Sequence, residues 1–205
     1  IVSIPRGDAA LIWVDLETGG LNGRLENGEL GCEYYPIFEV AIKITDTELN
    51  DICSPLHFII YQDESMIERS SKWALEQHTK SGLIDKVRKE GIDLDTAERL
   101  TLEHLAMHGI APWDKKACTG GVLAGNGIHY DRSFIMAQMP DFNAYLHYRQ
   151  KDISSINIAC MSWNKELFNE AKDAKQYKHE AMSDINESID EARLYKSVLE
   201  GERSI

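Results

Sequence analysis

Paired cysteines, long apolar runs and basic residues are all scarce in this sequence, and each absence argues against a class of protein. The four cysteines are scattered, with neither a CxxC pair nor a nearby set of histidines, so neither a zinc site nor a disulfide-stapled secreted scaffold is indicated. No apolar run approaches the roughly 20 residues that span a bilayer. We therefore expect free thiols in a reducing compartment and no membrane segment.

Positive charge is also in deficit. Lys and Arg number 22 against 34 Asp and Glu, which gives a formal net charge of −12. This balance opposes nonspecific attraction to long polyanions, so a nucleic-acid substrate should be small or locally gripped. Residues Ile1–Asp8 lack a signal-peptide pattern, and we expect a cytoplasmic protein. Because the sequence begins at Ile1 rather than Met, a trimmed targeting segment stays open.

The order of apolar and polar segments predicts an α/β or α+β sheet domain. The sequence contains no internal repeat or linker-like tract, so we expect a single domain over residues 1–205. Segments rich in β-formers or buried apolar residues predict strands at Ala9–Asp15, Ile37–Ile44, Leu56–Tyr61, Gly121–Asn126 and Asp152–Ser154. Helices are predicted at Met66–His78, from a capping box at Asp95–Glu98, at Tyr130–Met139 and at Met182–Leu199. Residues Asn22–Pro36 predict a loop.

Acidic residues stand at the ends of several of these segments. Asp15 and Glu17 are two apart at the end of the first strand, so both side chains point to the same side of the pleat. Asp131 opens a helix after a predicted strand, and Asp184 lies at the start of the last helix. Each acid alone is more often a solvated turn or a charge that favours a helix dipole. Together, at consistent positions, they predict one convergent site.

Carboxylates with a histidine form the set needed for phosphodiester hydrolysis by two divalent cations, held about 3.5–4 Å apart. Hard oxygen ligands suit Mg²⁺ or Mn²⁺. His179 would accept a proton from the attacking water, and its spacing from Asp184 places it just outside the helix. A surface histidine near a helix start is the alternative interpretation.

Ordered blocks of residues run along most of this sequence: ALIWVDLETGGL (Ala10–Leu21), IFEVA (Ile37–Ala41), WALEQHTKSGL (Trp73–Leu83), LAGNGIHYDRSF (Leu123–Phe134), HYRQKDIS (His147–Ser154) and HEAMSDINES (His179–Ser188). In this order they resemble the oligoribonucleases, which belong to the DEDDh exonuclease superfamily. Ordered blocks are far more specific than any one of them. The resemblance implies an RNase H-like fold with a mixed central sheet flanked by helices. It also implies a homodimer, and 3′-to-5′ trimming of short single-stranded oligoribonucleotides, down to dinucleotides, to nucleoside 5′-monophosphates.

The resemblance also implies roles for individual residues. The catalytic set is Asp15, Glu17, Asp131, His179 and Asp184, with the four acids as metal ligands. Leu21 and Trp73, with His78 nearby, would sandwich the bases, which is tolerant of sequence because every base has a π-face. The residues that would cap the 5′ phosphate are Tyr148, reaching across the dimer, Arg149 and Ser154. From the residues alone, Trp73 is equally a helix-core anchor and Arg149 a surface ion-pair partner.

The chain departs from the oligoribonuclease pattern in ways that bear on substrate length. Gly127 and Tyr130 stand where Ser and Gln are usual, so one hydroxyl of the phosphate cap is missing. The loop Asn22–Pro36 is longer than usual and would reshape or lengthen the substrate channel. A broader DEDDh exonuclease acting on longer single-stranded DNA or RNA is therefore an alternative, because no block reports contact with a 2′-hydroxyl. A catalytically silent nucleotide-binding protein is a third.

Overall fold

The computed structural model describes residues 9–175 and 180–201, and its centre is a five-stranded sheet in the order β3-β2-β1-β4-β5. β1 (Leu11–Thr18) pairs antiparallel with β2 (Ile37–Thr45) and parallel with β4 (Val122–Gly125). β3 (Leu56–Ile59) and β5 (Gln150–Asp152) are the outer strands. The sheet is mixed, and the expected α/β fold class is confirmed.

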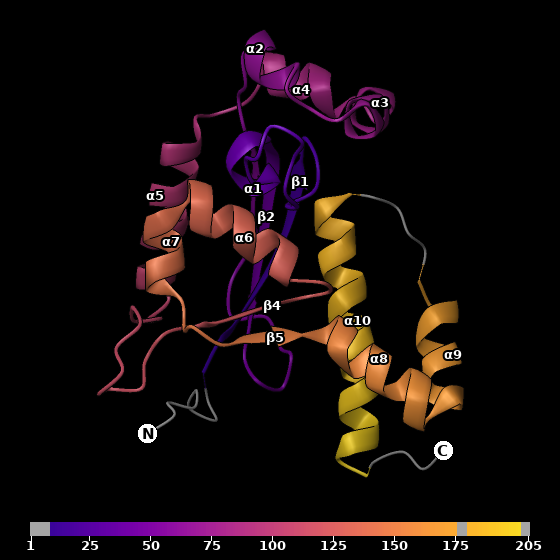
Figure 1. The fold of residues 1–205 in the computed structure, drawn as a ribbon. Helices are drawn as coiled ribbons and strands as arrows, with labels where there is room; N and C mark the ends of the chain where they lie inside the picture. The colour runs from indigo at the N-terminus through magenta and orange to yellow at the C-terminus, as the bar shows by residue number, and fades with distance from the viewer. Residues whose placement is uncertain (1–8, 176–179, 202–205) are drawn as a thin grey trace.

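Helices cover both faces of this sheet (Figure 1). One face carries α8 (Ile153–Trp163), α9 (Lys165–Asp173) and α10 (Ala181–Leu199), and the other carries α5 (Leu94–Met107), α6 (His129–Gln138) and α7 (Pro140–Tyr145). The shorter helices gather where β1 ends: α1 (Gly31–Tyr34), α2 (Glu64–Ile67), α3 (Lys72–Lys80) and α4 (Leu83–Lys89). Within the described ranges, no helix combines the length and the apolarity needed to cross a bilayer.

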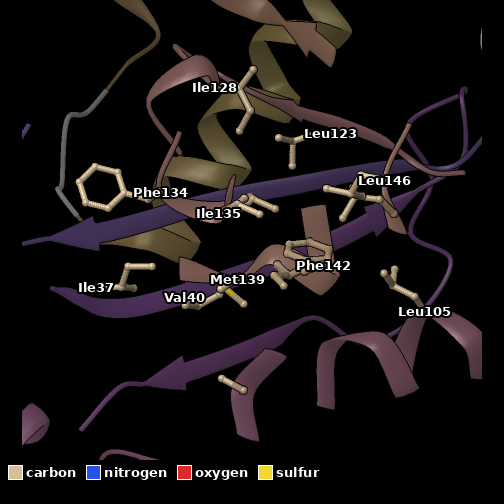
Figure 2. Close-up of a cluster of buried hydrophobic side chains, with 14 of the residues drawn as sticks. Ile37, Val40, Leu105, Leu123, Ile128, Phe134, Ile135, Met139, Phe142 and Leu146 are labelled. Atoms are coloured by element: carbon tan, nitrogen blue, oxygen red, sulfur yellow. The ribbon is translucent and has the colours of Figure 1, made fainter. Parts of the chain in front are cut away.

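Alternate residues along the strands build two separate cores, as expected for a sheet covered on both faces. Figure 2 shows the core that faces α5, α6 and α7, in which Phe134, Ile135 and Phe142 pack against Val40 and Leu123. The opposite core packs Trp13, Ala41 and Ala124 against Ile185 and Ile189 of α10. Asp15 and Glu17 extend this second face of β1 toward its end.

Three predicted elements differ from the structure because of local capping. Met66–His78 is broken into α2 and α3, since Ser71 Oγ accepts a hydrogen bond from Ala74 N at 3.2 Å and starts a new helix. α5 is capped by Asp93, which accepts from Thr96 N at 2.8 Å, so the predicted capping box at Asp95 is wrong. The strand predicted at Asp152–Ser154 ends at Asp152, whose carboxylate caps α8.

Candidate active site

Three carboxylates converge where β1 ends. The ligand oxygens of Asp15, Glu17 and Asp184 all lie within 4.8 Å of one another. Asp15 and Glu17 lie on the face of β1 that α10 covers, because residues two apart in a strand share a side. Ile185 and Ile189 dock α10 on that face, and this docking carries Asp184 in its first turn to the strand end.

Asp131 approaches the same point from α6. β4 runs parallel to β1, so both strands end at one edge of the sheet, and α6 begins just after β4. Asp131 is buried, and its Oδ1 accepts a hydrogen bond from Leu16 N at 2.9 Å, between the two acids of β1. The fold therefore brings Asp131 beside the other three acids, although it lies outside their group of ligand oxygens and turns one oxygen toward the backbone.

A buried polar network fixes α10 against the end of β4. Glu191 Oε2 accepts a hydrogen bond from Asn126 Nδ2 at 2.9 Å and pairs with Lys175 Nζ at 2.8 Å. The other oxygen of Glu191 accepts from Tyr195 OH at 2.7 Å. Asn126 directly follows β4, so this network holds the strand end that leads to Asp131 and the helix that carries Asp184 in one arrangement.

Glu39 is an acidic neighbour that the sequence reasoning treated only as a strand residue. It pairs directly with Glu17 across β1 and β2, and its carboxylate hydrogen-bonds His57 on β3. Directly opposed residues of an antiparallel pair share a face. The alternation of Ile37–Ile44 was a partial signal, because it places Glu39 out of phase with most apolar positions, but the place of Glu39 opposite Glu17 depends on the register of β1 with β2.

Crowded negative charge makes this cluster a fit for a divalent cation. Burial, with the charges of Asp131, Glu17 and Asp184, raises the pKa of Asp15 well above its ordinary value. Burial and the charge of Glu39 raise the pKa of Glu17 to about 8, and burial raises the pKa of Asp131 to about 7. The donors are hard carboxylate oxygens, and their shared negative charge is what a bound cation would neutralise.

We expect the stability of the cation-free protein to fall as pH rises from about 5 to about 8. The unfolded chain releases its carboxyl protons near pH 4, whereas Glu17 and Asp131 keep theirs to about 8 and about 7 in the folded state, so higher pH favours unfolding. A bound divalent cation should remove this penalty. Thermal unfolding at both pH values, in EDTA and in Mn²⁺, tests the prediction; a Mn²⁺-dependent rise in Tm that is no larger at pH 8 than at pH 5 would contradict it.

A groove of about 770 Å³ runs from Glu17 along the segment that follows β1. α3 forms one wall, and it is anchored because Ser71 N donates to Gly19 O at 2.7 Å. Leu21 is 71% exposed and Trp73 is 64% exposed, and both line this groove. The helix-core interpretation of Trp73 is therefore wrong, and two large apolar side chains stand open beside the acids.

His78 lies in the same groove but is largely covered. Its Nε2 is 3.0 Å from Thr18 O, and its ring packs edge-on against Phe38. His78 as a whole residue is only 8% exposed, and burial lowers the pKa of its ring. These contacts support the end of β1 and leave little of the ring for stacking.

The segment Asn22–Pro36, predicted as a loop, contains α1 and forms another wall of the groove. Gly23, Arg24, Leu25 and Tyr35 line the groove beside Leu21. Gly31 permits the close fold, since a β-carbon there would lie 1.8 Å from Leu21 O. Gln138 of α6 then donates to Cys32 O and Tyr35 O, each at 2.8 Å. The helix was missed because its stability comes from these tertiary contacts.

The residues predicted to cap the 5′ phosphate do not gather in one place within a single chain. Ser154 lies past β5, where its Oγ donates to Asp152 Oδ1 at 2.7 Å and Gly127 N donates to the same oxygen at 3.0 Å. Tyr148 and Arg149 come just before β5, which runs parallel to β1 and β4. They therefore lie where these strands begin, whereas the acids lie where β1 and β4 end. Both are exposed, with Arg149 Nε 3.2 Å from Tyr148 OH. His179 lies outside the described residues.

Comparisons with known proteins agree with this geometry. The family described as Exonuclease matches residues 12–192. An oligoribonuclease of Mycolicibacterium paratuberculosis is 37% identical over 186 residues, covering 91% of this chain and 79% of that protein. An oligoribonuclease of Chromobacterium violaceum is 37% identical over 187 residues, covering 91% of this chain and 93% of that protein.

Solved structures share the fold at much lower identity. The zinc-bound complex of E. coli exonuclease I with single-stranded DNA superposes with a TM-score of 0.65 and 18% identity over 93% of this chain. Exonuclease I of Methylocaldum szegediense superposes with a TM-score of 0.66 and 17% identity over 92% of this chain. The chain spans only 41% and 40% of those two exonuclease chains, so the likeness shows the RNase H-like fold alone.

Proposed function

The chain belongs to the oligoribonuclease family of the DEDDh exonucleases, and we propose that it trims short single-stranded oligoribonucleotides from the 3′ end to nucleoside 5′-monophosphates. The observation that carries this proposal is the convergence of Asp15, Glu17 and Asp184 beside a groove with two open apolar side chains. Dinucleotides are the smallest substrate we assign to it. The enzyme is a phosphodiester hydrolase.

The hydrolysis needs a residue that accepts a proton and residues that hold the departing nucleotide. Water attacks the phosphorus of the last nucleotide, the bond from phosphorus to the O3′ of the preceding nucleotide breaks, and that O3′ leaves with a proton. His179 takes the proton of the attacking water, since imidazole titrates near neutrality. Leu21 and Trp73 hold the base of the departing nucleotide, which keeps its phosphate at the acids.

Asp15, Glu17, Asp131 and Asp184 would hold two divalent cations, Mg²⁺ or Mn²⁺. Such a pair activates water and stabilises the leaving oxygen when bound. The fit rests on the donor chemistry of the site: every ligand is a carboxylate, and burial with mutual repulsion raises the pKa values of Asp15 and Glu17. The hydrogen bond from Leu16 N to Asp131 Oδ1 holds this carboxylate beside the two acids of β1.

The test compares turnover of a dinucleotide and of a 20-mer, each in ribo and deoxy form, with Mn²⁺ present. We expect the short ribonucleotides to be cleaved with the highest kcat/KM. A strong preference for the longer strand would support the broader exonuclease acting on single-stranded DNA or RNA. Binding without release of mononucleotide would support the silent nucleotide-binding protein.

A homodimer completes the site in this proposal. Tyr148 and Arg149 lie away from the acids of their own chain, so they would cap a 5′ phosphate held by the partner subunit. Arg149 suits this role because a planar guanidinium bonds phosphate oxygens in pairs. Ile158, Met161 and Trp163 of α8 are 59%, 47% and 86% exposed, an apolar surface of the kind that subunit contacts cover. The oligomeric state in solution tests this part directly.

Arg24 of the long loop should strengthen binding of oligonucleotides longer than a dinucleotide. It lines the groove, and Arg24 Nη1 donates to Gly28 O at 2.7 Å, which fixes the guanidinium within the turn. No carboxylate pairs with it in the described part of this acidic chain. We expect Arg24→Ala to raise KM several-fold for a pentamer but little for a dinucleotide, because one phosphate contact is lost.

Two variants control this experiment. Arg24→Lys should restore most of the pentamer binding, because it keeps the charge. Arg99→Ala removes an exposed arginine of α5 that pairs with Glu103 outside the groove, and should leave both KM values unchanged. Equal effects of Arg24→Ala on both substrates would contradict a role in length preference.

A further inference from the structure

A second group of metal-binding side chains lies outside the carboxylate cluster, where the loop between β2 and β3 meets the end of α5. Cys53 belongs to this loop, and His104 lies in the last turn of α5. His108 is the residue that caps the carboxyl end of α5. One ligand atom from each of the three lies within 4.8 Å of the other two. Sequence spacing gave no sign of this group, because Cys53 and His104 are 51 residues apart.

We propose that Cys53, His104 and His108 form a binding site for Zn²⁺, with water as the fourth ligand. A thiolate and two imidazoles are the donors that zinc prefers, whereas Mg²⁺ and Mn²⁺ prefer the oxygens of the carboxylate cluster. The two histidines are four apart on one helix, so their side chains lie on one face. The site is therefore distinct from the proposed catalytic centre in chemistry and in place.

The distances fit a tetrahedral zinc site after a small adjustment. Zinc bonds of about 2.3 Å to sulfur and about 2.0–2.1 Å to nitrogen place neighbouring ligand atoms about 3.3–3.6 Å apart. Cys53 Sγ and His104 Nε2 lie 3.2 Å apart, close to that spacing. A ligand atom of His108 lies within 4.8 Å of both, and the ring of this exposed residue can rotate toward them.

The surroundings also favour a cation at this point. The site lies at the carboxyl end of α5, where the helix dipole places partial negative charge. Asp51, two residues before Cys53, adds a carboxylate nearby, which also pairs with Lys43 Nζ at 3.2 Å. Zinc binding would form the zinc–sulfur bond, release the thiol proton to solvent and replace the contact of His104 Nε2 with Ser54 O.

Zinc at this site would tie the β2–β3 loop to α5. Cys53 packs against the core that faces α5, and His104 Nε2 already lies 3.1 Å from Ser54 O. Bonds through the metal would replace this contact with a stronger link between segments that are far apart in the sequence. Metal binding should therefore appear as added thermal stability, separate from any effect on hydrolysis.

Cobalt spectroscopy of the full chain tests the proposal, because Co²⁺ takes zinc sites and absorbs light when a thiolate binds it. The protein is stripped with EDTA and titrated with Co²⁺ in excess Mg²⁺, which occupies the carboxylate cluster. We expect a saturable thiolate-to-cobalt band that Zn²⁺ abolishes by displacement, and a higher Tm with Zn²⁺. The carboxylate cluster contains no sulfur, so it cannot give this band, and variants of the cysteines assign the band to one thiol.

Matched variants make the outcome decisive. Cys53→Ser should abolish the band, and His108→Gln, at an exposed position that should not disturb folding, should weaken Co²⁺ binding more than about 100-fold, since losing even an outer partner of a ligand costs about 10–100-fold. Cys118→Ser, at a cysteine far from this group in sequence, should keep the wild-type band. Absence of the band in the wild type, its survival in Cys53→Ser, or unchanged binding by His108→Gln would each overturn the proposal.

Discussion

Asp131→Asn is expected to lower the rate of dinucleotide hydrolysis about 1,000-fold while the protein stays folded. A cation at the scissile phosphate supplies several kcal/mol of transition-state stabilisation, and about 4 kcal/mol corresponds to a factor of about 1,000. The amide of Asn is a far weaker cation ligand than a carboxylate. Its carbonyl can still accept the hydrogen bond that Leu16 N now gives to Asp131 Oδ1 at 2.9 Å.

Stability separates this catalytic effect from misfolding. Asp131 is buried, and its charge helps to raise the pKa values of Asp15 and Glu17, so a neutral amide relieves repulsion in the cation-free protein. We expect the Tm of Asp131→Asn, in EDTA at about pH 8, to be equal to or higher than the Tm of the wild type. Asp141→Asn makes the same change at an exposed residue of α7 and should keep full activity. Turnover by Asp131→Asn at the wild-type rate would show that Asp131 is not a metal ligand.

The convergence of the acids could be predicted because it follows from strand geometry. Asp15 and Glu17 are two apart at a strand end, and Asp131 follows a strand that runs parallel to β1, so their positions depend on rules that a local sequence carries. The position of Asp184 depends on the docking of the last helix on the sheet. The spacing of apolar residues along this helix indicated that it docks there. Glu39 was missed because its place depends on the register of β1 with β2, and no local pattern fixes that register.

Features that arise from contacts between distant segments could not be predicted. α1 exists because Gly31 lies against Leu21 and because the side-chain amide of Gln138, far along the chain, donates hydrogen bonds to the carbonyl oxygens of Cys32 and Tyr35. The scattered cysteines argued against zinc, yet folding brings Cys53 to His104. The proposed roles of Tyr148 and Arg149 depend on contacts between two chains, since the site that they would serve lies on another copy of the chain.

Trp73→Ala is expected to raise KM for a dinucleotide about 5- to 150-fold with little change in kcat. Stacking of a base on an aromatic ring is worth about 1–3 kcal/mol, and every 1.4 kcal/mol is tenfold in affinity. The side chain is 64% exposed in the groove, so its removal takes little from the folded core. Tm should therefore stay within about 2 °C of the wild type, because exposed substitutions change stability by about 0.5 kcal/mol or less.

Three further variants distinguish stacking from a general loss of apolar surface. Trp73→Phe should recover most of the affinity, because it keeps an aromatic face. Leu21→Ala should raise KM less than Trp73→Ala, since Leu21, although 71% exposed, has no ring. Met107→Ala removes an 80% exposed apolar side chain at the end of α5, outside the groove, and should change neither KM nor kcat. If Trp73→Ala and Met107→Ala behave alike, the groove does not hold the base, and the substrate must approach the acids from another side.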